Sequence, residues 1–299
     1  MAHPGVELVR DLYADLKDHT GTLLERRAAM DDMVGGRVEP PPGIAATELT
    51  LGGRPAEALT PTPAPADQAI LYLHGGGYCM GNVNSHRDFA GRLAQVSGVT
   101  TYVLEYRLAP EHPFPAAFDD ALAAFDELAS RPDRPRIAIV GDSAGGGLAL
   151  AAALALRDAG GPTPTAVGAM SPWTDLTQTA ASYDRNAEVD PTLTRESLEL
   201  MAAAYAGPFD RRDPRISPRF GDLAGLPPLH LQVGGIEVLE DDAVEVAELA
   251  EEAEVDVELV VWPELFHVFQ AYPSDLIAES ATAMEAVGGF VARHLATPS

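Results

Sequence analysis

Residues 136–151 read RIAIVGDSAGGGLALA, and the order of features in this stretch decides the fold. A short β-rich run, RIAIV, leads directly into Gly141-Asp142-Ser143-Ala144-Gly145, which matches the pattern G-x-S-x-G, and a helix-like stretch begins immediately behind it. Strand, sharp turn and helix form the context in which this pattern has chemical meaning. The stretch therefore predicts a unit that projects the hydroxyl of Ser143 over the end of a sheet.

Similar units repeat on both sides of this stretch. Short β-rich runs are expected at 68–74, 100–106, 136–141, 165–171, 229–234 and 257–262, and helix-like stretches lie near 84–97, 115–130, 144–158 and 240–253. Strands that alternate with helices form parallel sheets covered on both faces, and buried parallel strands read as nearly continuous apolar runs, as these do. The sequence predicts an α/β fold with a mostly parallel central sheet flanked by helices.

Two segments depart from this alternation. Residues 1–35 have a helical pattern with Val9, Leu12, Tyr13 and Leu16 at the spacing of one helix face, and a long insertion follows the strand that ends near Ser171. The insertion has its own helical face, made of Leu198, Met201, Ala202 and Tyr205. Ligands bind at the carboxyl ends of parallel strands, so we interpret both segments as parts of a helical cap over a pocket. The alternative is that both only pad the outside of the sheet.

The sequence predicts one catalytic domain made of a core and a cap. Residues 1–44 form the N-terminal part of the cap, 45–172 and 215–299 form the core, and 173–214 form the cap insertion.

Ser143 is the candidate nucleophile. The glycines two positions before and after it allow a tight, strained turn, and the helix N-terminus behind it stabilises negative charge. A serine in front of a helix is also commonly a simple N-cap, but the preceding strand and the following helix favour the functional interpretation.

A second glycine-rich turn, His74-Gly75-Gly76-Gly77-Tyr78, follows the predicted strand ILYL. Glycines let backbone N–H groups approach a reacting carbonyl, and an H-G-G-G sequence serves as an oxyanion hole in lipases and esterases together with the N–H after the nucleophile. We expect Gly76, Gly77 and Ala144 to be the donors and Gly75 to shape the loop. A glycine turn without function is the alternative, and His74 is expected to brace the loop rather than act as a base.

The general base and the acid should come later in the chain, because hydrolases of this architecture run nucleophile, acid, histidine. His267 lies just beyond the last predicted strand, VELVVW, whereas His294 lies in the terminal helix and His230 inside a strand. His267 is therefore the candidate base. The acid that orients it should follow the strand LHLQVG, where Glu237 and Asp241 are the two candidates, and we favour Glu237.

The acidic residues beyond Asp241, as far as Glu258, have no lysine or arginine among them and are interpreted as a solvated face.

Composition excludes several other classes of protein. The 299 residues are 46% hydrophobic and carry a formal charge of −25, which disfavours nucleic acid and anionic membranes as partners. Lys17 is the only lysine, so a Schiff-base site and a phosphate-binding G-x-x-x-x-G-K loop are not expected.

Cys79 is the only cysteine, which excludes an internal disulfide and a cysteine-based zinc site and is typical of the cytoplasm. The N-terminal residues suggest neither a signal peptide nor a membrane span.

Several motifs together resemble the hormone-sensitive-lipase group of α/β-hydrolases, the bacterial carboxylesterases with an H-G-G-G loop. They are HGGGY at 74–78, YRLAPEHPFPAA at 106–117, GDSAGG at 141–146, the SPW…DP…SP passage at 171–218 and FHVF at 266–269. The resemblance spans about residues 66–270. It implies an eight-stranded sheet, a helical cap, a Ser-acid-His triad, no cofactor and no metal, and a preference for short to medium acyl esters. Several relatives are dimers through the sheet edge, which makes a homodimer an expectation.

The chain departs from the group at one position. The group usually has D-P-L-x-D after the penultimate strand, whereas this chain has Glu237-Val238-Leu239-Glu240-Asp241. The resemblance places Glu237 at the position of the triad acid and leaves Leu239 and Asp241 as supports for the turn.

The expected function is that of a serine carboxylesterase that hydrolyses small to medium acyl esters through Ser143, Glu237, His267 and a covalent acyl-enzyme. A lactone hydrolase or an N- or O-acetyl hydrolase that acts on a specific metabolite with the same triad is the main alternative. A small-molecule receptor without activity would lack the serine or the histidine, and both are present. A long-chain interfacial lipase is disfavoured because nothing resembles a basic amphipathic lid, and no stable membrane association is expected.

Overall fold

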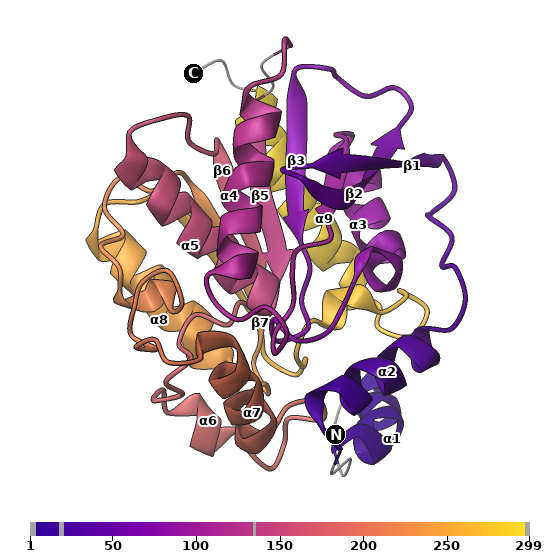
Figure 1. Cartoon of the computed structure of the whole chain (residues 1–299). Coiled ribbons are helices and arrows are strands. Elements are labelled where there is room, and N and C mark those ends of the chain that lie inside the picture. The colour runs from indigo at the N-terminus through magenta and orange to yellow at the C-terminus, as the bar shows by residue number, and fades with distance from the viewer. Residues whose placement is uncertain (1–3, 18–20, 134–135, 297–299) are drawn as a thin grey trace.

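The computed structural model describes residues 4–17, 21–133 and 136–296. Within these residues eight strands form one sheet in the order β1-β2-β4-β3-β5-β6-β7-β8 (Figure 1). The strands are β1 (Ile44–Leu51), β2 (Arg54–Pro61), β3 (Gln68–Leu73), β4 (Thr101–Leu104), β5 (Arg136–Asp142), β6 (Ala166–Met170), β7 (Leu229–Gly234) and β8 (Val257–Trp262). The chain has the predicted α/β-hydrolase fold.

The sheet is parallel from β4 to β8 and antiparallel at its other edge. β1 pairs with β2 and β2 with β4 in antiparallel register, whereas the remaining neighbours are parallel. The central strands β3, β5, β6 and β7 are almost wholly buried, as their continuous apolar sequences require. All six predicted strands are present, and two strands for which no range was predicted, β1 and β2, precede them in the chain.

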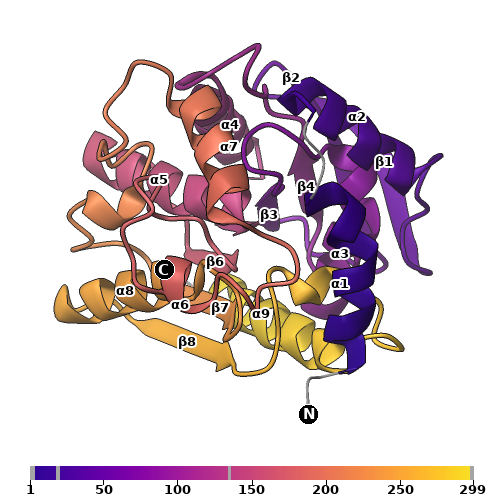
Figure 2. The same ribbon diagram turned by 90° about the horizontal axis from the view of Figure 1, so that it is seen from below.

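Helices cover both faces of the sheet (Figures 1 and 2). α3 (Val83–Ser97) and α9 (Glu279–Ala296) pack on one face, and their apolar residues share a core with Ile70, Val140 and Met170. α4 (Ala116–Ala129), α5 (Ala144–Ala159) and α8 (Glu240–Glu252) pack on the other face. This sandwich fixes the strand ends from which the site residues project.

The remaining helices gather at the carboxyl ends of the strands. α1 (Pro4–Lys17) and α2 (Leu23–Val34) lie there with α6 (Ser182–Arg185) and α7 (Arg195–Ala206), as the view from below shows (Figure 2). The four predicted apolar residues of α7 are all buried. In α1 Val9 is buried and Tyr13 is half-buried, but Leu12 is 49% exposed. The buried face of α1 is therefore narrower than the predicted apolar face. The side chain of Leu16 is outside the described part.

In the described ranges no helix is long and apolar enough to span a lipid bilayer.

Candidate active site

Ser143 occupies a strained turn between β5 and α5. Its φ of +53° lies in the left-handed region, which non-glycine residues rarely adopt. A Cβ at Gly141 would overlap the backbone of Gly145, and one at Gly145 would overlap the carbonyl of Leu73 on the neighbouring strand. The two glycines of the motif are therefore required by packing, and they let the turn approach the sheet closely enough to present the Ser143 hydroxyl.

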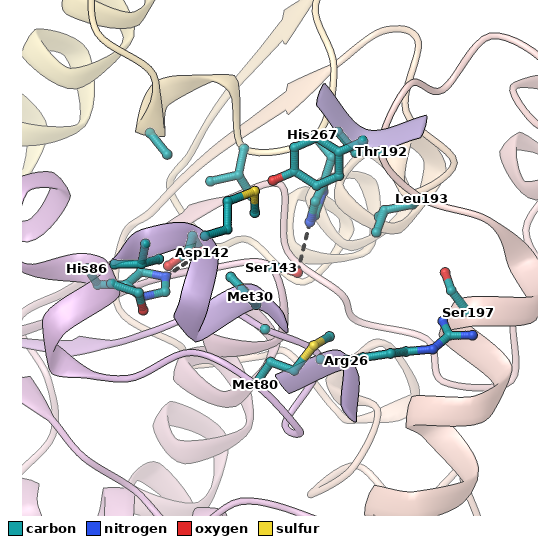
Figure 3. A pocket seen from close by; sticks show the side chains of 18 of the residues that line it. Arg26, Met30, Met80, His86, Asp142, Ser143, Thr192, Leu193, Ser197 and His267 are labelled. Atoms are coloured by element: carbon teal, nitrogen blue, oxygen red, sulfur yellow. Dashed lines mark hydrogen bonds and ion pairs between the residues drawn. The ribbon is translucent and has the colours of Figure 1, made fainter. Parts of the chain in front are cut away.

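Glu237, His267 and Ser143 form a hydrogen-bonded chain, although they come from three separate loops. His267 Nδ1 lies 2.6 Å from Glu237 Oε2, and His267 Nε2 lies 2.9 Å from Ser143 Oγ (Figure 3). With the ring proton on Nδ1 facing the carboxylate, Nε2 is left to accept the hydroxyl proton. The arrangement can remove a proton from Ser143 and stabilise the resulting imidazolium.

Glu237 is fully buried and held by donors. Its Oε1 accepts hydrogen bonds from the Gly234 N–H at 2.6 Å and from Ser171 Oγ at 2.7 Å. Ser171 Oγ in turn accepts a hydrogen bond from the N–H of Val268, next to His267. One hydroxyl at the end of β6 therefore aligns both the acid loop and the histidine loop.

Asp241, the alternative acid, faces away from His267. It accepts a hydrogen bond from the N–H of Ser182 and pairs with Arg185. The interpretation of the following acids as a solvated face was wrong in part. Asp242 is fully buried and accepts hydrogen bonds from backbone N–H groups, because α8 packs against the insertion, a contact that sequence spacing does not reveal.

Charge around the imidazole changes its basicity. Burial alone lowers the pKa of His267, but the adjacent carboxylate of Glu237, with smaller contributions from Asp190 and Asp142, outweighs burial and raises the pKa above its ordinary value. His267 is therefore a stronger base than a histidine in water.

The loop His74–Tyr78, called the glycine loop below, lies beside Ser143. The N–H of Gly75 donates to Asp142 Oδ1 at 3.0 Å, whereas the N–H groups of Gly76 and Gly77 have no partner within the described ranges. Both of these glycines have positive φ, and a Cβ on Gly77 would collide with Met201 of α7. The Ala144 N–H begins α5 and has no acceptor within its own helix. Three N–H donors that have no acceptor in the part of the chain that the structure describes therefore stand close to the nucleophile.

Asp142 and His74 brace this loop from behind. Asp142 is buried and also accepts a hydrogen bond from Tyr72 Oη at 2.7 Å, with His86 Nε2 at 3.6 Å. Burial acts to raise the pKa of Asp142, but His86 and the hydrogen bonds outweigh it and lower the pKa. The His74 ring stacks on Tyr106, and burial lowers its pKa to about 3. A neutral His74 fits the bracing role expected of it.

A pocket of about 430 Å³ opens in front of Ser143 and His267 (Figure 3). Its walls come from α2, α7, the glycine loop and the segment after His267, and many of the lining side chains are apolar, among them Leu23, Met30, Met80, Leu193, Leu198 and Met201. Such a pocket suits a small, mainly apolar ligand.

Sequence reasoning missed three contributors. Asp142 is the variable residue inside G-x-S-x-G, and Ser171 is the first residue of the SPW motif. Both therefore lie inside recognised motifs, but neither motif indicates what these two side chains contact. Arg26 lines the pocket from α2, and no motif contains it. Its place depends on how the N-terminal helices pack.

Comparison with known proteins agrees with the geometry. The α/β-hydrolase fold family matches residues 70–271. An acetyl-hydrolase from Streptomyces hygroscopicus is 42% identical over 97% of both chains, and an ethyl acetate hydrolase from Pseudomonas putida is 34% identical over 88% of this chain and 86% of that one. The crystal structure of an esterase from the bacterial hormone-sensitive lipase family superposes with a TM-score of 0.93 at 38% identity and covers 99% of both chains.

Proposed function

This chain belongs to the hormone-sensitive-lipase group of the α/β-hydrolase fold family and is an ester hydrolase, and from that premise we propose that Ser143, His267 and Glu237 are its catalytic triad. The observation that carries the proposal is the hydrogen-bonded chain from Glu237 through His267 to Ser143, which ends at the pocket.

The proposed reaction is a two-step acyl transfer. His267 Nε2 accepts the hydroxyl proton while Ser143 Oγ attacks the ester carbonyl, and the N–H groups of Gly76, Gly77 and Ala144 stabilise the oxyanion. Collapse of this intermediate breaks the bond to the alcohol, which leaves with the proton from His267. Water, deprotonated by the same histidine, then attacks the acyl-enzyme and releases the acid and Ser143.

The proposed substrates are esters with short to medium acyl groups. The size of the pocket, about 430 Å³, and its apolar walls support this range. A second candidate is removal of an acetyl group from a specific metabolite, because one relative at 42% identity is named an acetyl-hydrolase.

We also propose a cap, a homodimer and a cytoplasmic location for this chain. The lining residues from α2 and α7 support residues 1–44 and 173–214 as the cap. Strand β8 pairs only with β7 among the described residues, which leaves an edge at which two copies can join as a homodimer. A single buried cysteine is consistent with the cytoplasm.

Hydrolysis of 4-nitrophenyl esters of graded acyl length tests the function, with lactones and acetamides measured alongside. We expect highest kcat/KM for short and medium esters, and a loss of several orders of magnitude in kcat for Ser143→Ala and His267→Ala. Near wild-type turnover by Ser143→Ala would contradict the triad. A clear preference for acetamides or lactones would instead retain the triad and select the second kind of substrate.

A further inference from the structure

Arg26 brings a positive charge into the pocket of the proposed esterase. It belongs to the first turn of α2 and lines the same cavity as Ser143. Its Nε donates to the carbonyl of Gly21 at 3.2 Å, but its two terminal nitrogens have no hydrogen-bond partner and no carboxylate at ion-pair distance within the described ranges. A guanidinium keeps its charge at any working pH, so the pocket contains donors that no acceptor in the described part of the chain satisfies.

This state is unusual for an arginine of this chain. Acidic residues outnumber basic ones by 45 to 20, and the next residue, Arg27, pairs with Glu111. Two other arginines that have no carboxylate in the described part of the protein, Arg131 and Arg212, lie over the rings of Tyr102 and Phe220 instead. Arg26 has neither kind of partner there, although the chain contains 45 acidic residues.

The surroundings of Arg26 favour an anion. Figure 3 shows its side chain extending toward the α7 side of the pocket, where Leu193 and Ser197 are drawn, while His86 and Asp142 lie on the opposite side of Ser143. α7 begins at Arg195, so the positive end of its dipole is at the same side as the guanidinium. One side of the pocket therefore carries a positive charge. Of the acidic lining residues, Asp142 lies on the opposite side of Ser143 and Asp88 is paired with Arg92, and many of the other lining side chains are apolar.

We propose that Arg26 determines specificity by binding a carboxylate of the substrate, so that the preferred substrates are small esters that carry a negative charge. The inference rests on the proposed function, since it requires the scissile ester to lie at Ser143. A guanidinium matches a carboxylate with two parallel N–H donors, and the partly enclosed, apolar pocket strengthens the pair relative to water. The uncharged remainder of the substrate then lies against the apolar walls.

Two pairs of isosteric esters test this proposal. Monoethyl succinate and ethyl succinamate differ by a carboxylate or a carboxamide on the acyl side, and 4-acetoxybenzoate and 4-acetoxybenzamide differ in the same way on the alcohol side. In at least one pair we expect wild-type protein to favour the anionic ester in kcat/KM. Arg26→Gln should lower that anionic-to-neutral ratio about 10- to 100-fold, mainly through KM. The responding pair tells which side of the ester faces Arg26.

Two further variants control for charge. Arg26→Lys keeps the positive charge but lacks the two parallel N–H donors of the guanidinium, so it should retain part of the preference for the anionic ester. Arg212→Gln changes the net charge by the same amount outside the pocket and should leave the ratio unchanged. The proposal is overturned if wild-type protein prefers neither anionic ester, or if Arg26→Gln lowers both members of a pair by the same factor. Those results would leave the esterase proposal intact, because Ser143→Ala tests that independently.

Discussion

Asp142 links the nucleophile turn to the glycine loop. Its carboxylate accepts hydrogen bonds from the Gly75 N–H and Tyr72 Oη, and it directly precedes Ser143 in the chain. The position of the proposed oxyanion donors relative to Ser143 therefore depends on one buried anion. The N–H groups of Gly76 and Gly77, which follow Gly75, have no acceptor among the described residues.

We expect Asp142→Asn to lower kcat about 10- to 100-fold with a smaller change in KM, because loosening the glycine loop weakens interactions made in the transition state. Steady-state kinetics, normalised by titration of the reactive serine, measures the effect. Asp126→Asn, a matched change at an exposed position of α4, should have wild-type kinetics. An Asp142→Asn variant with unchanged kcat would show that the loop keeps its shape without the anion.

Glu237→Gln tests the acid through the pH profile. The base acts only when neutral, so kcat/KM rises with pH through the pKa of His267, which Glu237 raises. Removing that charge should shift the acidic limb to lower pH, and loss of the oriented ring should lower kcat by about 10²- to 10⁴-fold.

Asp241→Asn is the control for this variant, because Asp241 contacts Arg185 and Ser182 instead of His267. Its acidic limb should coincide with that of wild-type protein. If Asp241→Asn loses activity and Glu237→Gln does not, the choice between the two acids was wrong.

At the residue scale, the order of strands along the chain predicted the three residues of the proposed triad. Ser143, Glu237 and His267 were predicted because each follows a strand of a parallel sheet, and parallel strands end at one rim. Ser171 contacts Glu237 and Val268 in distant loops, and Arg26 reaches the pocket only through the packing of α2, so spacing alone contained no signal for either residue.

At the element scale α2 is fastened to the core by Arg27. Its Nε donates to the Cys79 carbonyl at 2.6 Å, and Nη2 donates to the Ala109 carbonyl at 2.7 Å, while Glu111 completes the ion pair. The helix that supplies Leu23, Arg26 and Met30 to the pocket is thereby held against the end of the glycine loop.

Arg27→Ala should therefore free α2. We expect faster hydrogen exchange across residues 23–34, a higher KM for neutral esters and a loss of about 2 kcal/mol in the free energy of unfolding, mostly from the carbonyl hydrogen bonds because Glu111 is half-exposed. Arg136→Ala, which removes an ion pair with the exposed Asp67, should change stability by less than about 1 kcal/mol. Unchanged exchange in α2 would contradict the fastening role.

The elements differ in how well the sequence predicted them. The parallel strands were recognisable because continuous apolar runs alternate with helical patterns. β1 and β2 form an antiparallel hairpin at the sheet edge, and their half-buried sequences, IAATELTL and RPAEALTP, lack such runs. The prediction of a solvated face was wrong for Asp242 of α8, because its carboxylate accepts hydrogen bonds from the backbone of the insertion, which no local pattern shows.

At the scale of the whole molecule, ion pairs connect different elements of a chain whose net charge is −25. Arg185 of α6 pairs with Glu240 and Asp241 of α8, and Arg293 of α9 pairs with Glu258 of β8. These ion pairs join distant parts of the chain, although exposed pairs contribute little individually.

Asp242 is a buried acid whose ionisation should oppose global stability. Its Oδ2 accepts the N–H groups of Thr174 and Asp175, each at 2.8 Å, and both it and Asp175 are fully buried. Burial raises the pKa of Asp242 well above its usual range, and the nearby Asp175 carboxylate raises it further. Between the pKa of about 3.9 in the unfolded chain and the raised folded value, the native state binds the extra proton.

Stability should therefore fall as pH rises through this window, by up to about 1.4 kcal/mol per pH unit from this one group. Burial lowers the pKa values of His74 and His230, which gives the opposite slope below about pH 6.5, so the contribution of Asp242 must be read as a difference. Asp242→Asn retains an acceptor for the two N–H groups but cannot ionise. Denaturant unfolding from pH 4.5 to 8.5 should show wild-type protein losing stability relative to Asp242→Asn as pH rises, then a constant difference once Asp242 is ionised in both states. A difference independent of pH over the whole range would mean that Asp242 titrates in the folded protein as it does in the unfolded chain.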